Sequence, residues 1–561
     1  MSELKELITK FALQNAVKYE GTARVNNIIP KVLGTNPDLK SEMKSLVSDI
    51  KEVVDVVNKL SPEEQLSQLR EIAPEMLEKK EPEKKGLKEL EDVKAGGVVM
   101  RFAPSPSGPM HIGHAITGGL TSLYVKKYGG KFFVRIEDTN SSNIYAPAYD
   151  MIKEEGDWLF GNVTEYVIQS KRLEIYYDYA KKLLDMGKIF ICTCSPDKYH
   201  KYSKKMLDCP CKKNSLEKNK ELWDKMHNEF RPGDAVARYK TNLETKNPAL
   251  MNFPLFRIND DEHPLQGKKY RVWPLMNMSV TVDDIELGMT HIIRAKDHLD
   301  NSKKQKMIYD DLGIEFPKTY FLGRLKFDDM EISSSKTKEK ISNGEYSGWD
   351  DIRLPFIAAL KKRGFRPEAF MRFTQEIGLT QTDKVYTKND FYKTLAAFNK
   401  DVVEPNAKHF FLMKEPVNIT LVGDTNRTIE LDLNPETMKG GRILKTSSGR
   451  YLIEKSDVDR LKDGAIERLM DCVNFKKNSD GTYEFLSEDY ESFKEGGHII
   501  MHWLPDDESQ LTKIFVRMPD NTVFEAVAEK GVEKVKEGEI VQFERFGFAA
   551  KTGNEFWFNH R

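Results

Sequence analysis

Residues 1–95 follow a helical pattern of apolar and polar positions. Apolar residues recur every three or four positions over Leu4–Val17 and Met43–Leu60, which predicts two amphipathic helices. Ser61, followed by a proline, is typical of a helix start, because serine caps free N–H groups and proline fits the first turn. Charges of both signs mix over 78–94, as in an exposed tether or a solvated helix face. We therefore expect an N-terminal helical appendage that is tethered to the rest of the chain.

At Gly96 the pattern changes to short apolar runs that alternate with helical stretches. Val98–Phe102 ends in a loop rich in proline and serine, a helical pattern follows, and Lys131–Ile136 is a second apolar run. Strand, helix and strand with short joints are typical of the right-handed parallel unit of an α/β sheet. After a long insertion at about 189–272, further elements of the sheet are predicted: strands at Thr290–Arg294 and Thr319–Leu322, and a helix at Leu299–Leu312.

The last third of the chain changes character again. Helical patterns cover Asp350–Arg363 and Pro367–Ile377, and from about residue 408 short alternating strands and turn residues predict β-barrels. The expected fold class is an α/β Rossmann-type parallel-sheet domain over 96–345 with an α+β insertion. It is preceded by the helical appendage and followed by a helical region at 346–407 and a β-barrel region at 408–561.

Composition excludes some classes of protein. A chain of 561 residues is too long for one compact core, and 39% apolar with 31% charged residues is a soluble globular balance. No apolar stretch is long enough to span a bilayer, and five cysteines in such a chain predict a reducing, cytoplasmic setting. With 87 basic and 88 acidic residues, any RNA-binding surface must be a local patch. Basic clusters that could contact phosphates, or form solvated faces, are Lys201–Lys205, Lys212–Lys213 and Lys361–Arg363.

The loop after the first strand carries the strongest chemical signal. Residues 104–114 read Pro-Ser-Pro-Ser-Gly-Pro-Met-His-Ile-Gly-His and end in a helix start, whose free N–H groups and dipole favour a phosphate. His111 and His114 share one face of the first turn, and Gly113 leaves room for a nucleotide against the backbone. The imidazoles can donate to a phosphate whose charge grows in the transition state. Two such histidines could also cap the helix or bind a metal, but the strand–loop–helix context favours a nucleotide site.

A second loop, residues 331–336, reads Glu-Ile-Ser-Ser-Ser-Lys and follows the last predicted strand. Such a loop can close over a triphosphate, with Lys336 supplying charge to the leaving pyrophosphate. Alone, a serine- and lysine-rich loop is usually a solvated linker. Its place after a sheet strand, with the histidine motif upstream, predicts a role in nucleotide chemistry.

Four of the five cysteines lie within twenty residues, as the pairs Cys192-Thr-Cys194 and Cys209-Pro-Cys211. Four thiolates from two tight turns suit tetrahedral zinc, so we predict a structural Zn²⁺ site. The alternative is a loop with four reduced thiols. Cys472 is expected to be a small apolar residue.

Together the two loops resemble the signature motifs of class I aminoacyl-tRNA synthetases, and residues 95–561 are similar to archaeal-type glutamyl-tRNA synthetases. The resemblance is carried by Arg101–Gly108, Val134–Thr139, Asp283–Asp284, Gly288–Arg294, Lys296–His298, Gly348–Asp351 and Glu544–Phe548. It implies activation of L-glutamate by ATP with Mg²⁺ and transfer to tRNA(Glu), with tRNA(Gln) open as a second acceptor. It also implies that the insertion holds the tRNA acceptor end, that 346–407 contacts the stem and that 408–561 binds the anticodon. A monomer without membrane contact is expected.

The resemblance assigns roles to matched positions. Glu137 is expected to meet the substrate ammonium and Arg294 its side-chain carboxylate, because a guanidinium matches a carboxylate at two points. The alternative for Arg294 is a structural ion pair at a strand end. The remaining assignments are Arg101, Ala103 and Ser105 in the glutamate pocket, His111, His114, Ser334 and Lys336 in catalysis, and Pro104, Gly113 and Ser335 in ATP binding.

Two positions depart from the family pattern. Met276 stands where the family has a pocket tyrosine, and Ser334 stands where the second motif has a lysine, for which Lys336 is the expected replacement. Three alternative functions predict other features. A glutaminyl-tRNA synthetase lacks an arginine at the position of Arg294, and a small-molecule nucleotidyltransferase needs neither barrels nor a second motif. A silent tRNA-binding relative would have lost a histidine of the first motif or Lys336.

Overall fold

The computed structural model of the chain describes residues 3–18, 21–36, 39, 43–73, 76, 86–241 and 247–561. They belong to two compact units, Met1–Lys85 and Gly86–Arg561. The first part of the predicted tether, residues 78–85, lies outside the described residues. Its described part, from Gly86 to Lys94, contains no helix or strand.

The first unit is helical, and its helices are α1 (Glu3–Lys18), α2 (Val25–Thr35), α3 (Met43–Val57) and α4 (Pro62–Ile72). Buried Ile8, Leu13 and Ile50 contribute to a core of its own. Ser61 caps α4 as predicted: its Oγ accepts from the Glu64 amide at 3.2 Å, and the Glu64 carboxylate accepts from the Ser61 amide at 2.8 Å. The helix expected over 43–60 ends at Val57, and α2 was not predicted.

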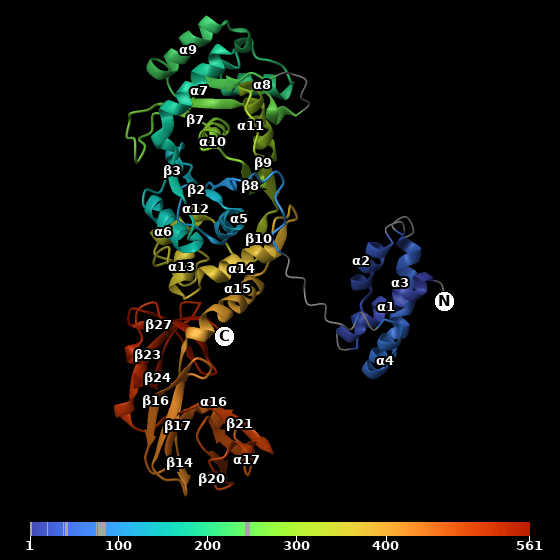
Figure 1. The fold of residues 1–561 in the computed structure, drawn as a ribbon, viewed down its shortest axis with the longest axis vertical. Helices are drawn as coiled ribbons and strands as arrows, with labels where there is room; N and C mark the ends of the chain where they lie inside the picture. Colours follow the sequence, from blue (N-terminus) through green and yellow to red (C-terminus); the bar gives the residue numbers. More distant parts are fainter. Residues whose placement is uncertain are drawn as a thin grey trace. The chain divides into compact units, whose positions relative to one another are not determined.

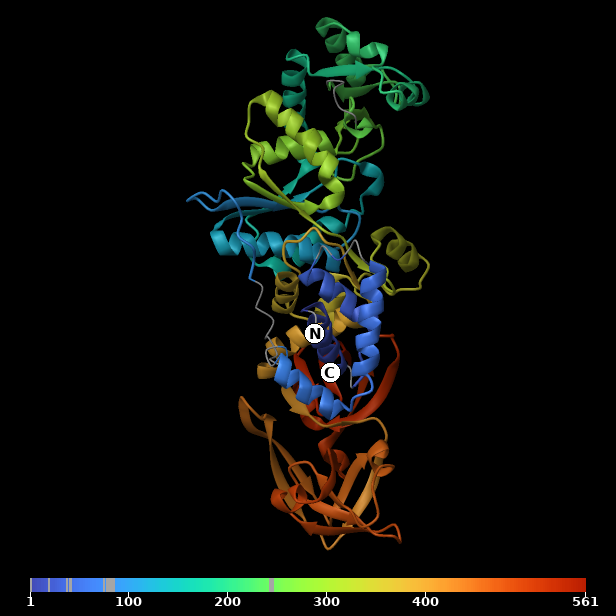
Figure 2. The ribbon, with the colours of Figure 1, turned by 90° about the vertical axis from the view of Figure 1, so that its right-hand side faces the viewer.

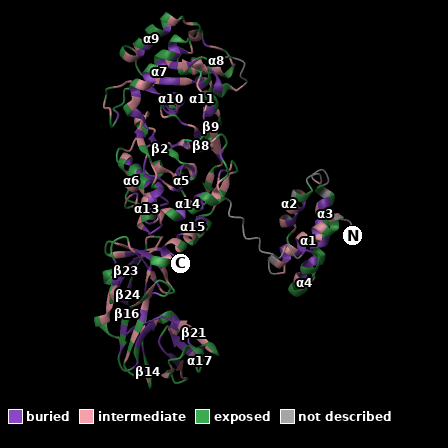
Figure 3. Ribbon diagram, viewed as in Figure 1, coloured by how far each residue is buried: buried purple, intermediate pink, exposed green. Residues whose placement is uncertain are grey.

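The second unit is built on a parallel sheet. Strands β1 (Val98–Phe102), β2 (Gly130–Ile136) and β3 (Glu165–Ile168) pair in that order, and β8 (His291–Ala295) pairs with β9 (Lys318–Leu322). The Thr290 amide donates to the Val99 carbonyl at 3.0 Å, which places β8 beside β1. The strand order is therefore β3–β2–β1–β8–β9, and the predicted parallel sheet is confirmed. The three middle strands, β2, β1 and β8, are mostly buried (Figure 3), whereas β3 and β9 at the edges are only partly buried.

Helices pack on this sheet, and its strands have apolar cores on both faces. The buried α5 begins directly after the loop at residues 104–111, which we call the histidine loop. It contacts β1, β2 and β8. The helices of this region are α5 (Ile112–Tyr128), α6 (Ala148–Phe160), α7 (Leu173–Asp185), α10 (Met276–Glu286) and α11 (Leu299–Leu312). The predicted bounds of α11 and β1 are confirmed to the residue.

The insertion is an α+β element, as predicted. Its four strands pair antiparallel in the order β4–β5–β6–β7, around buried Trp223 and Trp273. Its elements are β4 (Ile189–Cys192), α8 (Pro196–Lys204), α9 (Leu216–Asn228), β5 (Val236–Tyr239), β6 (Pro254–Ile258) and β7 (Val272–Pro274). Figures 1 and 2 show it at the end of the Gly86–Arg561 unit that lies farthest from the C-terminal strands.

The helix predicted over Asp350–Arg363 is wrong in its first half, because α13 spans only Ile357–Lys362. The Asp351 carboxylate accepts from the Ser347 and Arg353 amides at 3.0 and 3.1 Å, which fixes a turn, and a proline follows. The other elements of this region are β10 (Leu325–Phe327), α12 (Ser334–Ser342), α14 (Pro367–Ile377), β11 (Lys384–Tyr386) and α15 (Lys388–Val403).

From Lys408 onward the chain is rich in strands. One sheet has the order β12–β25–β26–β27–β23–β24–β13, another has β21–β18–β19–β20–β14–β17–β22, and β15 pairs with β16. That these sheets close into barrels stays a prediction, as do the predicted domain boundaries. The strands are β12 (Lys408–Phe410), β13 (Leu412–Met413), β14 (Pro416–Val422), β15 (Arg427–Asn434), β16 (Met438–Thr446), β17 (Arg450–Glu454), β18 (Ile466–Leu469), β19 (Asn474–Lys477), β20 (Tyr483–Ser487), β21 (Gly497–Met501), β22 (Trp503–Pro505), β23 (Leu511–Arg517), β24 (Val523–Glu529), β25 (Ile540–Phe543), β26 (Gly547–Thr552) and β27 (Glu555–His560), with helices α16 (Lys455–Val458) and α17 (Tyr490–Lys494).

Candidate active site

The histidine loop leaves the carboxyl end of β1 and begins α5, where predicted. His111 is the residue that caps α5, and its Nδ1 accepts from the Gly113 amide at 3.1 Å. The two imidazoles stack, with ring centroids 3.8 Å apart. A Cβ on Gly113 would lie 3.0 Å from the His111 ring, so glycine here makes room for that ring over the helix start.

Both imidazoles are neutral in this environment. Burial lowers the pKa of His114 to about 4, and burial together with His114 holds the pKa of His111 well below its usual range. The Nδ1 atoms of both rings accept backbone N–H groups, that of His114 from the His111 amide at 3.4 Å. The proton of each neutral ring therefore sits on Nε2, which is a donor available to a phosphate oxygen at the positive end of α5.

Glu155, which the sequence analysis did not predict, holds this loop in place by a hydrogen bond to its backbone. It lies on α6, is 6% exposed, and accepts from the Met110 amide at 2.6 Å. Burial raises the pKa of Glu155 to about 8, so the carboxyl group is protonated at neutral pH. The charged residues around Glu155 in the sequence do not distinguish it from an exposed carboxylate, and its partner lies 45 residues away.

We predict that Glu155 makes the protein less stable as pH rises. In the unfolded chain this carboxyl ionises near pH 4.5, whereas in the folded protein it keeps its proton until about pH 8. Between these values the folded state binds more protons, so the free energy of unfolding falls by about 1.4 kcal/mol per pH unit from this group. Thermal unfolding of wild type and Glu155→Gln at a series of pH values measures it. The Gln variant should have the flatter profile between pH 5 and 8, and equal slopes would contradict the assignment.

The second motif lies against the first. A Cβ on Gly108 would lie 3.2 Å from the Ser334 Cβ and 3.1 Å from Trp349, so the two loops are in close contact. Ser334 begins α12, and Ser335 and Lys336 follow on its exposed first turn. The Lys336 Nζ forms an ion pair with Glu331 Oε1 at 2.6 Å. Lys336 therefore has to leave Glu331 before it can contact a phosphate.

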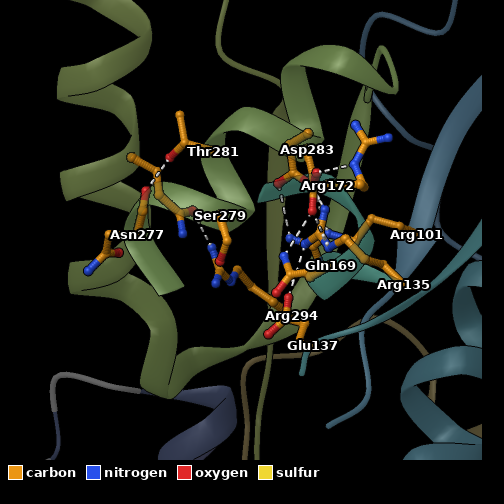
Figure 4. A network of polar contacts seen from close by, with 12 residues as sticks. Arg101, Arg135, Glu137, Gln169, Arg172, Asn277, Ser279, Thr281, Asp283 and Arg294 are labelled. Atoms are coloured by element: carbon orange, nitrogen blue, oxygen red, sulfur yellow. Dashed lines mark hydrogen bonds and ion pairs between the residues drawn. The ribbon is translucent and has the colours of Figure 1, made fainter. Parts of the chain in front are cut away.

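Buried arginines and carboxylates meet near the carboxyl ends of β1, β2 and β8 (Figure 4). Asp284 of α10 accepts from Arg101 Nε at 3.1 Å and from Arg135 Nη1 at 2.5 Å. Arg135 also donates to Glu137 Oε1 at 3.1 Å. Both arginines are at most 4% exposed, and Arg135 is fully buried. The network thus fixes Arg101 on β1 and Glu137 directly after β2, and both residues are predicted for the glutamate pocket.

The neighbouring Asp283 carries a second part of this network. It accepts from Arg172 Nε at 2.7 Å, from Gln169 Nε2 at 2.9 Å and from the Tyr176 hydroxyl at 2.8 Å. These three donors lie shortly after β3 in the sequence. Asp283 therefore joins α10 to the segment that follows β3, the outermost strand of the sheet. Sequence reasoning missed all three donors and Arg135.

Arg294 is the exception in this network, because it has no acidic partner. Its Nη1 donates to Gln305 Oε1 at 2.7 Å and to Ser302 Oγ at 3.1 Å, and its Nε has no partner. Across the described ranges, no carboxylate forms an ion pair with Arg294, so the structure does not contain the strand-end ion pair considered above. Burial lowers the pKa of Arg294 to about 10, which leaves the 7% exposed guanidinium charged at neutral pH.

The positive and negative charges of the side chains around Arg294 do not balance. Arg101, Arg135 and Arg172 pair with Glu137, Asp283 and Asp284, whereas Arg294 is close enough to Asp284 and Glu137 to feel their charge but forms an ion pair with neither. One positive charge is therefore in surplus, and it sits on a buried side chain. An uncompensated buried charge is costly, so a carboxylate that binds beside Arg294 would remove an existing electrostatic penalty.

The other predicted pocket residues follow β1. The Pro104 carbonyl accepts from the Glu137 amide at 3.0 Å, which holds the loop against the end of β2. Ala103 is partly buried and Ser105 is exposed beside it, and their contacts with a substrate stay predictions. Met276, at the position of the family's tyrosine, is the first residue of α10 and is 37% exposed.

The four clustered cysteines converge as predicted. The Sγ atoms of Cys192 and Cys209 are 3.7 Å apart, as are those of Cys194 and Cys211, and all four lie within 4.8 Å of one another. None of them forms a disulfide. A zinc ion with four Zn–S bonds of about 2.3 Å requires S···S edges of about 3.8 Å. The donor set and its spacing therefore fit tetrahedral zinc. Cys472 is buried and apart from this cluster, as expected.

The sequence matches two families of known proteins. Residues 97–405 match the family described as tRNA synthetases class I (E and Q), catalytic domain. Residues 500–551 match the tRNA synthetases class I (E and Q), anti-codon binding domain. The chain belongs to the class I tRNA synthetases for glutamate and glutamine. The resemblance stated from the motifs is thereby confirmed.

Relatives of this class I synthetase match it over nearly the full length. The glutamate–tRNA ligase of Methanocaldococcus jannaschii is 40% identical over 549 residues, which covers 97% of each chain. That of Methanobrevibacter smithii is 40% identical over 98% of this chain and 97% of the relative. That of Thermococcus kodakarensis is 40% identical over the same shares.

Among solved structures, the synthetase resembles a glutamate tRNA ligase from Elizabethkingia meningosepticum in complex with its amino acid. The TM-score is 0.41 at 18% identity, over 55% of this chain and 70% of that one. In the portion of the synthetase that the structure describes, every helix is too short or too polar to cross a membrane.

Proposed function

We propose that this synthetase is a glutamate–tRNA ligase that activates L-glutamate with ATP and transfers it to tRNA(Glu). The observation that carries the proposal is Arg294, a buried guanidinium without a carboxylate partner in a network with one surplus positive charge. Glutamate supplies a side-chain carboxylate, which forms a charged two-point pair with a guanidinium, whereas the amide of glutamine cannot. The names of the archaeal relatives support the same substrate.

The reaction has two steps. An oxygen of the glutamate α-carboxylate attacks the α-phosphorus of ATP, the bond from that phosphorus to the oxygen that bridges to the β-phosphate breaks, and pyrophosphate leaves. The terminal ribose hydroxyl of the tRNA then attacks the carbonyl carbon of glutamyl-adenylate, loses its proton, and releases AMP. In the first step, negative charge develops on the phosphate oxygens, so donors that are fixed in place before the reaction lower the barrier.

The two loops supply these donors. The Nε2–H groups of His111 and His114 and the N-terminus of α5 face one end of the phosphate chain. The ammonium of Lys336 balances the charge of the departing pyrophosphate after it exchanges Glu331 for phosphate. Ser334, which contacts Gly108, holds the second loop against the first, and Pro104, Gly113 and Ser335 shape the nucleotide site.

ATP–pyrophosphate exchange tests the proposal. Exchange is measured with glutamate or glutamine, each with and without tRNA, followed by charging of purified tRNA(Glu) and tRNA(Gln). A glutamate–tRNA ligase exchanges with glutamate and charges tRNA(Glu), and the tRNA(Gln) reaction shows whether it accepts a second tRNA. Exchange that requires glutamine would instead identify a glutaminyl-tRNA synthetase.

We also propose that Cys192, Cys194, Cys209 and Cys211 hold a structural zinc ion. Cys192 ends β4, and the second pair begins the turn at residues 209–213, so the ion would join the two turns of the insertion. Bound zinc would supply no catalytic chemistry here, because four thiolates leave no open coordination position. The insertion is the part proposed to hold the acceptor end of the tRNA, with 346–407 along the stem and 408–561 at the anticodon.

We expect about one zinc ion per chain in elemental analysis of the purified protein. Cys209→Ser/Cys211→Ser should lose the metal, because two ligands cannot hold it. The variant should then charge tRNA poorly while its affinity for ATP stays unchanged, since the cysteines lie outside the nucleotide loops. Cys472→Ser is the matched control and should keep the zinc. A metal-free preparation that charges tRNA at the full rate would refute the site.

A further inference from the structure

The side chains of α11 that hold Arg294 are neutral. Arg294 lies beside Arg101 and Glu137 (Figure 4). The three other arginines of the network each form an ion pair with an aspartate, at nitrogen–oxygen distances from 2.5 to 3.1 Å. Arg294 instead donates to the uncharged oxygens of Gln305 and Ser302. The surplus positive charge therefore lies where the protein supplies hydrogen bonds but no counterion.

Gln305 and Ser302 together fix the orientation of the guanidinium. They are three positions apart on α11, hence on one face of the helix, and are 1% and 7% exposed. Because a guanidinium has donors only, Gln305 presents its amide oxygen to it. Both contacts are made by the same nitrogen, Nη1, at 2.7 Å to Gln305 and at 3.1 Å to Ser302. The two N–H groups of Nη1 are thereby used.

Another nitrogen of Arg294 remains for a ligand. Nε has no partner, but it is closed off from solvent. Nη2 forms no hydrogen bond with the described residues either, and it is not among the closed-off atoms. A ligand in the pocket therefore reaches the guanidinium from the Nη2 side, opposite the contacts with α11.

A glutamate at position 305 would neutralise Arg294. Glutamate has nearly the shape of glutamine, so a carboxylate oxygen in the place of Oε1 would lie about as close to Nη1 as the amide oxygen does, at 2.7 Å. Because Arg294 is already buried without a counterion, this carboxylate would remove an electrostatic penalty and stabilise the free protein. It would also take up the positive charge that attracts a substrate carboxylate.

We propose that Gln305 is a specificity-determining residue whose neutral amide orients Arg294 without neutralising it. The surplus charge is thereby left for the side-chain carboxylate of the substrate. Gln305 acts through Arg294, so it is a positioning residue and not a catalytic one. The inference rests on the proposed function, because the awaited carboxylate is that of glutamate. It predicts two opposite effects of one substitution, a more stable protein and a weaker reaction with glutamate.

The test compares Gln305→Glu with wild type in two assays. Thermal unfolding without substrates measures Tm, and ATP–pyrophosphate exchange with tRNA present measures kcat/KM for glutamate and glutamine. We expect a higher Tm, a fall of about a hundredfold in kcat/KM for glutamate, and a much smaller change for glutamine. KM for ATP should stay unchanged, because Arg294 is the only described residue to which the Gln305 side chain is hydrogen-bonded.

Gln169→Glu is the matched control for stability. Gln169 is also 1% exposed and belongs to the same network, but its Nε2 donates to Asp283 at 2.9 Å. A carboxylate there would face a like charge, so Tm should fall. Opposite shifts in Tm from the same change of residue type assign the effect to the charge beside Arg294. Gln305→Met keeps the size of the side chain without its acceptor, and it should lower kcat/KM for glutamate by about tenfold without raising Tm.

Both predicted effects of Gln305→Glu are required. A variant that is no more stable than wild type, or that keeps the wild-type kcat/KM for glutamate, would overturn the proposal. The proposed function can fail separately. A wild-type protein that shows no exchange with glutamate contradicts the ligase assignment, and the Tm of Gln305→Glu still decides whether position 305 controls the charge on Arg294.

Discussion

Replacing Arg294 with alanine is expected to lower kcat/KM for glutamate by about two to three orders of magnitude, because the substrate carboxylate is then buried without a partner. Arg294 is 7% exposed and forms no ion pair in the described structure. The side-chain carboxylate of the substrate is therefore the only one that loses its ion-pair partner in the variant. Glutamine has no charge to strand, so its slow reaction should change much less, and the preference for glutamate should narrow or invert.

The measurement is kcat/KM for both amino acids with tRNA present. Arg294→Lys serves as the charge-conserving control and should not restore activity, because an ammonium cannot make the planar two-point contact. If wild type prefers glutamine, or if Arg294→Ala loses both substrates equally, Arg294 has a structural role and the choice of glutamate loses its physical basis.

The second large effect concerns the nucleotide loops. His114→Ala and Lys336→Ala are each expected to lower the rate of glutamate activation by about a hundredfold or more, with little change in glutamate binding. Both groups act on charge that develops only on the phosphates. Lys340→Ala is the matched control, since Lys340 lies one turn further along the same helix and pairs with Glu345 at 3.5 Å and with Glu331, the partner of Lys336, at 3.9 Å. Falls of less than about tenfold in both variants would show that the nucleotide site is wrongly placed.

The same assay has a pH signature. Because burial lowers the pKa of His114 to about 4, this ring is already neutral at pH 6, and burial together with His114 holds the pKa of His111 well below its usual range. Raising the pH from 6 to 8 therefore removes no proton from them. Exchange rates should not fall over this range through loss of histidine charge, as they would if the rings acted as cations.

The sequence predicts the site as far as its parts are local. The loop from Pro104 to His114 lies where expected, because a short apolar strand, a proline-rich turn and a helix start are all set by neighbouring residues. The arginine network could not be predicted, because Arg101 and Asp284 are 183 residues apart and meet only in the folded sheet. A signal existed in Lys131–Ile136, where Arg135 interrupts an apolar strand and therefore requires a buried acidic partner.

The helix predicted over Asp350–Arg363 is wrong in its first half for a similar reason. Residues 350–363 contain apolar positions at helical spacing, but the Asp351 carboxylate bonds backbone amides on both sides of it and Pro355 cannot donate. Local side-chain bonds thus override periodicity. The lack of a counterion at Arg294 cannot be read from the sequence at all, since it depends on every side chain packed around the guanidinium.

The position of Asp284 affects how the protein is made. On the ribosome, β1 and β2 emerge long before α10 and β8, because the whole insertion is translated between them. During this interval Arg101 and Arg135 lack their partner from α10, and the side of β1 that later receives β8 is an open strand edge. The nascent catalytic sheet can close only when more than half of the chain has been synthesised. The rate of translation through the insertion therefore sets how long that edge is exposed.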